Sequence, residues 1–433
     1  MSNKKVIQGW CFYDWSNSVY SLVITSAIFP VYYQGVTVAA DGSDLVDFFG
    51  IKMINSVLYT YALSFSFLVT GLILPILSGV ADYLGKKKLM LKIFTYLGGA
   101  SCIGLFWFDG SNVEFGIACV VLASLGYSGS LVFYDAFLPE IAAIDEYDSI
   151  SAKGYSYGYV AGVILLVVNI VTIQMHDHLV FLGVHQELDA VRLSFLTVGL
   201  WWIGFAQYSF YRLPEGKKLE TINNLWSNGY NELRKVWIEL KSLPSTRFFL
   251  ISFFLYNMGV QTIMYLAETF GSKELQMEDQ KLIATILAIQ LIGILGAYLF
   301  AKLSNAKGNK YSITVMLFIW ISICFCAYFV KNDVQFYILA VFVGLVMGGI
   351  QSLSRATYSK LIPLETNRTA SYFSFYDVTF NISIACGTFS FGLVEDISGS
   401  MRNSTLVLAI FFVLGLVVLF KVKSPFILPS RNQ

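Results

Sequence analysis

The sequence predicts an all-α membrane protein, with twelve transmembrane helices in two six-helix bundles around a central cavity. Three observations lead to this fold class. Of the 433 residues, 56% are hydrophobic and only 13% are charged, with a mean hydropathy of +0.65, whereas soluble domains carry about 25% charged residues. Apolar runs of bilayer-spanning length recur along the whole chain. Lysine and arginine gather in every second connection between these runs, which is typical of cytoplasmic loops.

The spans follow from runs of roughly 20 apolar residues. In chain order they cover residues 12–34, 57–81, 89–108, 115–138, 153–174, 193–212, 247–270, 281–302, 311–330, 334–354, 370–394 and 404–421. The basic connections follow the even-numbered spans, so we expect both termini in the cytoplasm. The first span is too long for a cleavable signal peptide and lacks a small-residue cleavage site. We expect it to act as its own insertion signal.

A polar stretch, 213–246, divides the spans into an N-terminal bundle (1–212) and a C-terminal bundle (247–433). Apolar residues recur at helical spacing within this stretch, with lysine and glutamate between them. We expect an amphipathic helix on the cytoplasmic membrane surface, with a regulatory or partner-binding helix as the alternative. Its apolar face consists of Leu219, Ile222, Leu225, Trp226, Tyr230, Leu233, Trp237 and Leu240.

The first span carries a stripe of polar residues. They stand at i, i+3, i+4, i+7 and i+11, namely Asp14, Asn17, Ser18, Ser21 and Thr25, and this spacing gathers them on one helix face. Lipid cannot satisfy such side chains, so the stripe must face protein or water. A helix cap at the membrane surface is the alternative for Asp14.

Spans four, seven and ten carry similar stripes, in contrast to spans three, six, nine and twelve. One helix of each triplet is therefore expected to face a cavity and another to face lipid. For any single serine, a hydrogen bond between helices is the simpler interpretation. The three stripes are Ser124, Ser128 and Asp135; Asn257, Gln261, Tyr265 and Glu268; and Gly344, Gly348, Gln351 and Arg355.

The charged candidates have gating or ion-coupling roles in this interpretation. Asp14, Asp135, Arg355 and Asp377 fall in the cytoplasmic third of their spans, and Glu268 falls in the outer third. Lone charges at membrane depth are costly. We therefore expect ion pairs that open and close with the cavity, and protons or sodium ions as the coupling ions.

The candidate substrate-cavity residues are uncharged. They are Asn17, Ser21, Thr25, Ser128, Gln261, Gln290, Gln351 and Asn381. A neutral polar lining suits a small neutral or zwitterionic solute, whereas a polyanion would need several cations. The net charge of +1 gives no basic surface for nucleic acid. The expected partners are therefore a small polar solute and the lipid bilayer, with no cofactor and no metal, for a monomer.

A loop motif stands between spans two and three, at Gly79, Asp82, Gly85, Lys86 and Lys87. The first glycine allows a close helix approach, and the aspartate can lie at the N-terminus of a neighbouring helix, where the dipole favours an anion. The second glycine permits a tight turn, and the lysines can pair with acids. This motif resembles one of the major facilitator superfamily; 305–310 keeps a degraded copy in the second half.

The whole chain resembles one branch of that superfamily, the "unknown major facilitator" group related to fungal vacuolar amino-acid effluxers. The resemblance rests on the segments 13–18 with Tyr20, 154–162, 201–202, 256–257 with Gly259, and 348–355. It implies the major facilitator fold and secondary active transport by alternating access, with amino-acid efflux as one activity. It also implies a location in the cell (inner) membrane. Met258 stands where relatives often carry an acid, so that coupling role is not expected here.

A membrane-embedded enzyme or lipid-handling protein is the alternative function. It would use the outer loop in which all three histidines lie, namely His176, His178 and His185 with Asp177, Glu187 and Asp189. No catalytic constellation stands within the spans, so we expect no enzyme activity. The six cysteines lie in or beside apolar spans and do not have zinc-site spacing.

Overall fold

The computed structural model describes residues 3–38, 42–178, 185–216, 225–363 and 366–423. Within these ranges, twelve helices are long and apolar enough to cross a membrane, as the sequence predicts. They cover Lys4–Val36, Asn55–Leu84, Lys87–Trp107, Val113–Ile141, Tyr147–Gln174, Glu187–Arg212, Pro244–Leu275, Lys281–Lys307, Asn309–Phe329, Asp333–Leu361, Thr369–Ser398 and Met401–Leu419.

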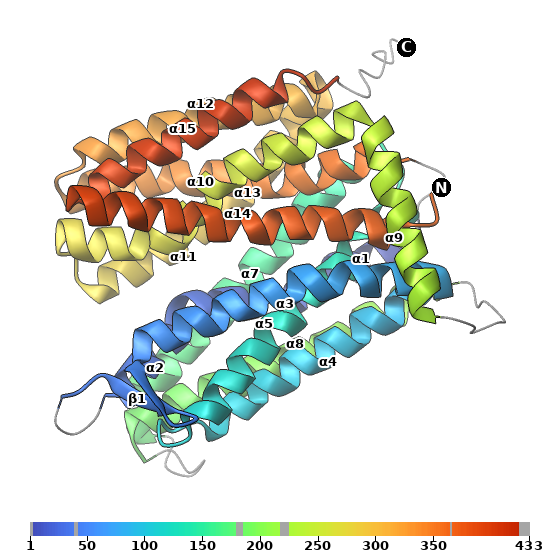
Figure 1. Cartoon of the computed structure of the whole chain (residues 1–433). Helices are drawn as coiled ribbons and strands as arrows, with labels where there is room; N and C mark the ends of the chain where they lie inside the picture. The colour runs from blue at the N-terminus through green and yellow to red at the C-terminus, as the bar shows by residue number, and fades with distance from the viewer. Residues whose placement is uncertain (1–2, 39–41, 179–184, 217–224, 364–365, 424–433) are drawn as a thin grey trace.

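The helices form two groups that lie side by side in Figure 1. The first group contains α1 (Lys4–Val19), η1 (Tyr20–Ile28), α2 (Phe29–Val36), α3 (Asn55–Leu84), α4 (Lys87–Gly104), η2 (Leu105–Trp107), α5 (Val113–Asp135), α6 (Leu138–Ile141), α7 (Tyr147–Gln174), η3 (His176–His178) and α8 (Glu187–Arg212). The second contains α10 (Pro244–Leu275), α11 (Asp279–Lys307), α12 (Asn309–Phe329), α13 (Asp333–Leu361), α14 (Thr369–Ser398) and α15 (Met401–Leu419). We call them the N-terminal and C-terminal bundles.

Helix α9 (Leu225–Ser242) lies across one end of the molecule and reaches both bundles (Figure 1). A short antiparallel hairpin, β1 (Leu45–Phe48) with β2 (Ile51–Ile54), lies at the opposite end. This hairpin was not predicted from the sequence. We refer to the two ends as the α9 end and the hairpin end; α1 begins and α15 ends at the α9 end.

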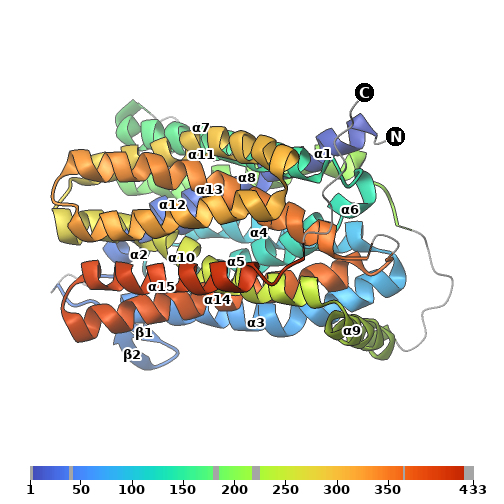
Figure 2. The same cartoon turned by 90° about the horizontal axis from the view of Figure 1, so that it is seen from above.

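The predicted amphipathic helix falls partly outside the described residues, because Leu219 and Ile222 precede α9 and the side chains of Leu225 and Trp226 are not described. In the remainder, the buried positions are Gly229, Val236 and Leu240. Tyr230 and Trp237 are more than half exposed. The face that packs on the bundles is therefore rotated from the predicted apolar face. Figure 2 shows α9 beside α3 and α14.

The first span differs from a regular α-helix. It starts at Lys4, and the side chain of Asn3 caps it by accepting a hydrogen bond from the backbone N–H of Lys5. The helix therefore includes polar residues that lie outside the span predicted from hydropathy. From Tyr20 to Ile28 it is wound as a π-helix. Such segments are rare, and functional sites are enriched in them.

Candidate functional site

A cavity lies between the two bundles, and the space among its lining atoms, open solvent included, is about 1240 Å³. Seven spans line it: the first, fourth, fifth, seventh, eighth, tenth and eleventh. The N-terminal bundle contributes Asp14, Ser18, Ser21, Leu22, Ser26, Tyr127, Leu131, Val132, Asp135, Tyr155, Gly158 and Tyr159. The C-terminal bundle contributes Gln261, Met264, Tyr265, Gln290, Met347, Gln351, Arg355, Phe373, Tyr376, Asp377 and Phe380. The four spans with predicted polar stripes are all among them.

Arg355 of α13 reaches across to the N-terminal bundle and binds two carboxylates. Its Nη2 donates to Asp14 Oδ2 at 3.2 Å, and its Nη1 donates to Asp135 Oδ1 at 3.1 Å. Its Nε donates to the Ser151 hydroxyl at 2.9 Å. Asp14 Oδ2 also accepts a hydrogen bond from the Tyr134 hydroxyl at 2.8 Å. Because Arg355 is only 1% exposed, these contacts replace the water that its charge would otherwise need.

Aromatic rings enclose the guanidinium group. Its central carbon lies 4.3 Å from the ring centre of Tyr155 and 4.6 Å from that of Trp10. Ring faces attract such a cation. Gly154 completes the site, because a Cβ at this position would lie 2.4 Å from Asp14 Oδ2 and 3.1 Å from Arg355 Nη2. The α1–α7 approach at this glycine therefore positions Asp14 for Arg355.

Asp377 does not join these ion pairs, although the sequence analysis grouped it with them. It lies on α14 and lines the cavity, where its Oδ2 accepts a hydrogen bond from the Asn381 amide at 2.9 Å. Asn381 was predicted as a substrate-cavity residue, and it is not among the residues that line the cavity. It lies one helical turn further along α14 than Asp377, and it donates to both the carboxylate and the backbone carbonyl of that residue.

Thr25 was predicted to line the cavity, and Ser26 occupies that place instead. The prediction assumed α-helical spacing, in which Ser21 and Thr25 share a face. In the π-helical segment the equivalent neighbour is five residues away, and the Ser26 hydroxyl donates to the Ser21 carbonyl at 3.0 Å. The winding of the helix therefore changes which hydroxyl faces the cavity.

Two other predicted cavity residues are buried away from it. Ser128 follows Tyr127, and the cavity-lining face of α5 runs through Tyr127, Leu131 and Asp135. Asn17 is buried on α1, and its Oδ1 accepts a 3.4 Å hydrogen bond from Ser18. These two residues lie one position away from Tyr127 and Ser18, which do line the cavity.

Glu268 lies on α10 outside the cavity lining. Of the predicted substrate-cavity residues, the structure brings together Ser21, Gln261, Gln290 and Gln351. Tyr155 and Tyr159 of the fifth span also line the cavity and were not predicted from the sequence. Their spacing of four residues was the available signal, but a tyrosine in an apolar span is usually interpreted as a packing residue.

The predicted loop motif closes the α9 end between α3 and α14. Asp82 accepts hydrogen bonds from the backbone N–H groups of Ala370 at 3.2 Å and Ser371 at 2.7 Å. These N–H groups lie in the first turn of α14, where the helix dipole favours an anion. Gly85 ends α3 with φ 62° and ψ 30°, a left-handed conformation that glycine adopts without strain. A Cβ at Gly79 would lie 2.1 Å from the backbone oxygen of Gly229, so α9 packs directly on this position.

Lysines extend this closure. Lys87 pairs with Glu140 in the N-terminal bundle and also donates to the hydroxyl of Thr369 in the C-terminal bundle at 2.6 Å. Lys86 precedes α4 as its N-cap residue and is partly exposed. On the other side of α9, Arg368 pairs with Glu232 and Glu239. Helix α9 therefore connects α3 to the start of α14.

A second polar closure lies between α7 and the C-terminal bundle. Asp148 of α7 is fully buried and accepts hydrogen bonds from Lys360 at 2.8 Å, Ser304 at 2.8 Å and Asn309 at 2.7 Å. Ser304 directly precedes the degraded copy of the loop motif, and Asn309 lies within it. In the first closure the loop supplies the acid, whereas here the loop region supplies donors and the opposite bundle supplies the acid.

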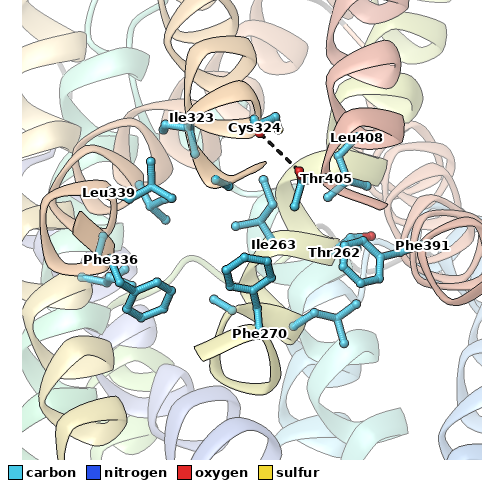
Figure 3. Close-up of a pocket in the computed structure, with 16 residues that line it drawn as sticks. Thr262, Ile263, Phe270, Ile323, Cys324, Phe336, Leu339, Phe391, Thr405 and Leu408 are labelled. Carbon is cyan, nitrogen blue, oxygen red and sulfur yellow. Dashed lines mark hydrogen bonds between the residues drawn. The ribbon is translucent and has the colours of Figure 1, made fainter. Parts of the chain in front are cut away.

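A separate cavity of about 600 Å³ lies wholly within the C-terminal bundle (Figure 3). Its lining is apolar apart from the hydroxyl groups of Thr262 and Thr405 and the thiol of Cys324. Thr405 donates to the Cys324 carbonyl at 3.2 Å. Since its lining contains no charged or amide side chain, it does not suit a polar solute.

The histidines of the alternative function do not form a metal site in the described part of the chain, where no group of three or more His, Cys, Asp or Glu side chains could hold a metal ion. The Nε2 atom of His176 lies 3.3 Å from Oδ1 of Asp177. His185 lies beyond 179–184, which the structure does not describe. His185 and Gln186 donate their backbone N–H groups to Asp189, which caps α8.

The chain matches a known protein family over nearly its whole length. The model of the family described as "Vacuole effluxer Atg22 like" matches residues 2–425. The chain belongs to this Atg22-like family. An uncharacterized MFS-type transporter, YxiO of Bacillus subtilis (strain 168), is 27% identical over 95% of this chain and 93% of its own. Autophagy-related protein 22 of Saccharomyces cerevisiae is 23% identical over 95% and 90%.

Solved structures with a similar fold are major facilitator superfamily transporters. The fucose:proton symporter FucP of E. coli has a TM-score of 0.67 at 14% identity, over 97% of this chain and 98% of that one. The proton:xylose symporter XylE has a TM-score of 0.68 at 13% identity, over 97% and 95%. This Atg22-like chain therefore has the predicted major facilitator fold, and its relatives are transporters, not enzymes.

Proposed function

We propose that this Atg22-like transporter is secondary active and carries a small polar solute by alternating access. The supporting observation is the central cavity, which both bundles line and which cross-bundle contacts close at the α9 end. In this proposal the parts 1–212 and 247–433 rock against each other, with 213–246 as their connection. The hairpin end is the side from which the solute enters or leaves in the conformation described.

The Asp14–Arg355–Asp135 cluster would act as the gate of the cavity at the α9 end. Opening that end separates the bundles, so Arg355 would lose its contacts to Asp14 and Asp135. The polar side chains of Ser21, Gln261, Gln290 and Gln351 remain candidates for contact with the solute. Glu268 remains a candidate for ion coupling, with protons or sodium ions as the driving ions.

The α9 end is proposed to face the cytoplasm of a cell whose inner membrane holds the protein as a monomer. The basic loops support this orientation. The exposed rings of Tyr230 and Trp237 support a position of α9 at the membrane surface, because aromatic side chains favour the interface. Labelling of single introduced cysteines in intact cells, with a membrane-impermeant thiol reagent, tests this orientation. A cysteine in place of His185 should be labelled, and a cysteine in place of Lys241 should not.

Amino acids are the first solutes to test, and efflux is the first direction, because the family model describes effluxers. Purified protein in proteoliposomes should exchange a radiolabelled amino acid, with protein-free liposomes as the control. A pH or sodium gradient should drive accumulation. Exchange without any effect of either gradient would contradict ion coupling, and no flux of amino acids, sugars or nucleosides would contradict solute transport itself.

A further inference from the structure

The central cavity has an unequal number of acids and bases. Among its lining residues, Asp14, Asp135 and Asp377 are acids and Arg355 is the only base. Arg355 pairs with the first two. Within the described residues Asp377 has no ion-pair partner, and the residue is buried, with only 7% exposed. A buried carboxylate is costly unless a cation or a proton compensates its charge.

Aromatic residues line the same cavity as this acid. On α14 the residues Phe373, Tyr376, Asp377 and Phe380 all line the cavity, and their spacing of i, i+3, i+4 and i+7 puts them on one helix face. The N-terminal bundle and α10 add Tyr127, Tyr155, Tyr159 and Tyr265. Aromatic faces attract ammonium groups. The 4.3 Å contact of the Arg355 guanidinium with Tyr155 shows that this wall already holds one cation.

We propose that Asp377 anchors a protonated amine of the transported solute, so that the cavity takes amines and amino acids in preference to neutral or anionic molecules. This inference rests on the proposed function of the cavity. It narrows the neutral or zwitterionic solute expected from sequence to one that carries an amine, since the cavity itself contains the charged residues. Asn381, one helical turn further along α14, donates a 2.9 Å hydrogen bond to Asp377 Oδ2, which leaves the other carboxylate oxygen for the amine.

The opposite end of a zwitterion has separate partners. Gln261, Gln290 and Gln351 line the same cavity, and side-chain amides can donate to a carboxylate. The three nitrogens of Arg355 already donate within the gate. A carboxylate on the solute is therefore accommodated by amides and is not required for binding.

Thermal unfolding of the purified full-length protein tests the charge preference. The probes are isoamylamine and phenethylamine, the amino acids leucine and phenylalanine, and the matched isoamyl and phenethyl alcohols, all at pH 7. A ligand that binds the folded state raises the unfolding midpoint. The amines and amino acids should raise it, and the alcohols should not. Equal shifts by an amine and its alcohol would overturn the proposal without any variant.

Variants at Asp377 test the anchor. Asp377→Asn should weaken amine binding at least about tenfold, or about 1.4 kcal/mol, and Asp377→Glu should keep the preference for amines. Asp396→Asn is the matched control, because Asp396 is an exposed acid at the far end of the same helix. Unchanged amine affinity in Asp377→Asn would overturn the proposal; if that variant does not fold, loss of the amine preference in Asp377→Glu would do so.

Thermal unfolding with sodium chloride as the only added solute distinguishes a sodium site at Asp377 from an amine site. A shift of the midpoint that depends on sodium and Asp377, with no shift by the amines, would overturn the inference. Proteoliposome flux distinguishes this failure from that of the proposed function. Flux of a neutral or anionic solute without amine binding would leave transport intact and remove only the amine anchor.

Discussion

At the scale of residues, two carboxylates share Arg355, and this sharing determines the net charge of the proposed gate. The guanidinium group donates to Asp14 and Asp135 within 3.2 Å, and only Asp14 has the additional Tyr134 hydroxyl. The base therefore serves two acids, and loss of the base leaves both uncompensated. Loss of either acid leaves a one-to-one pair.

This asymmetry predicts an order of stabilities. Arg355→Met should lower the free energy of unfolding by about 3–5 kcal/mol, because two buried carboxylates lose their cation. Asp14→Asn should lower the free energy of unfolding by roughly 1.5–3 kcal/mol, which is the contribution of hydrogen bonds to a charged group. The loss is smaller because Arg355 keeps its ion pair with Asp135. Thermal unfolding in detergent measures both. An equal loss in the two variants would contradict the shared-base interpretation.

A triple variant provides the control. Combined with Asp135→Asn, these two substitutions remove all three charges, and replacement of a whole buried cluster is often neutral. We therefore expect the triple variant to be more stable than Arg355→Met alone. A further loss of stability would show that packing, not charge, determines the cost.

At the scale of elements, the close approach of α1 and α7 positions the residues of the proposed gate. One site of close contact is Gly154, where any Cβ would meet Asp14 and Arg355. Four residues further, a Cβ at Gly158 would lie 2.3 Å from the Ser18 hydroxyl oxygen. Two glycines at i and i+4 therefore bring α1 against α7, as small residues do between membrane helices.

Gly154→Ala should destabilise the protein by about 1–3 kcal/mol, which is typical of overpacking, and it should reduce solute flux by displacing Asp14. Gly204→Ala in α8 is the matched control, because nothing lies within 4 Å of a Cβ there. That change should be neutral or mildly stabilising, since alanine favours helix more than glycine does. Similar losses in both variants, measured by thermal unfolding and by flux, would contradict the role of the close approach.

The sequence predicts the helices better than it predicts their ends and faces. Twelve spans follow from hydropathy because a bilayer requires long apolar runs. The start of the first helix at Lys4 could not follow from hydropathy, because residues outside the apolar run continue the helix. Ser26 could not be predicted in place of Thr25, because π-winding leaves no signal in the composition of the span. Ion pairing of Arg355 was predictable, because it lies at the same depth in the membrane as three acids. Which two of these acids it pairs with depends on the rotation of the helices, which the sequence does not show.

At the scale of the whole molecule, two closures of the same polarity hold the α9 end shut. In one, Asp82 of the N-terminal bundle caps α14 of the C-terminal bundle. In the other, Asp148 of the N-terminal bundle accepts from Lys360 and from side chains in or next to the second-half loop. Both acids therefore lie in the N-terminal bundle, and both sets of donors lie in the C-terminal bundle. Separation of the bundles exposes both acids at once.

Asp148→Asn should open the α9 end more often, because Lys360 loses its ion pair while the uncharged amide would keep only weaker hydrogen bonds. We expect at least a tenfold shift between closed and open forms, which corresponds to about 1.4 kcal/mol. Spin labels on cysteines at the exposed residues Ala143 and Asn305, in a Cys326→Ser background, would report the separation of the bundles. Asp145→Asn, an exposed acid at the same end, is the control, and an equal response to both substitutions would contradict the closure.

The excess of acids in the central cavity has an electrical consequence. For a carrier that works as proposed, the empty cavity bears more negative than positive charge, and a bound ammonium group offsets one unit of it. Reorientation of a charged cavity moves charge through the membrane potential, at about 2.3 kcal/mol for each elementary charge per 100 mV across the full field. For an amine without a carboxylate, membrane voltage therefore acts on the return of the empty carrier more strongly than on the loaded step, whereas a zwitterion leaves the net charge of the cavity unchanged. The rate of turnover in a polarised membrane would then depend on which of these two steps is slower.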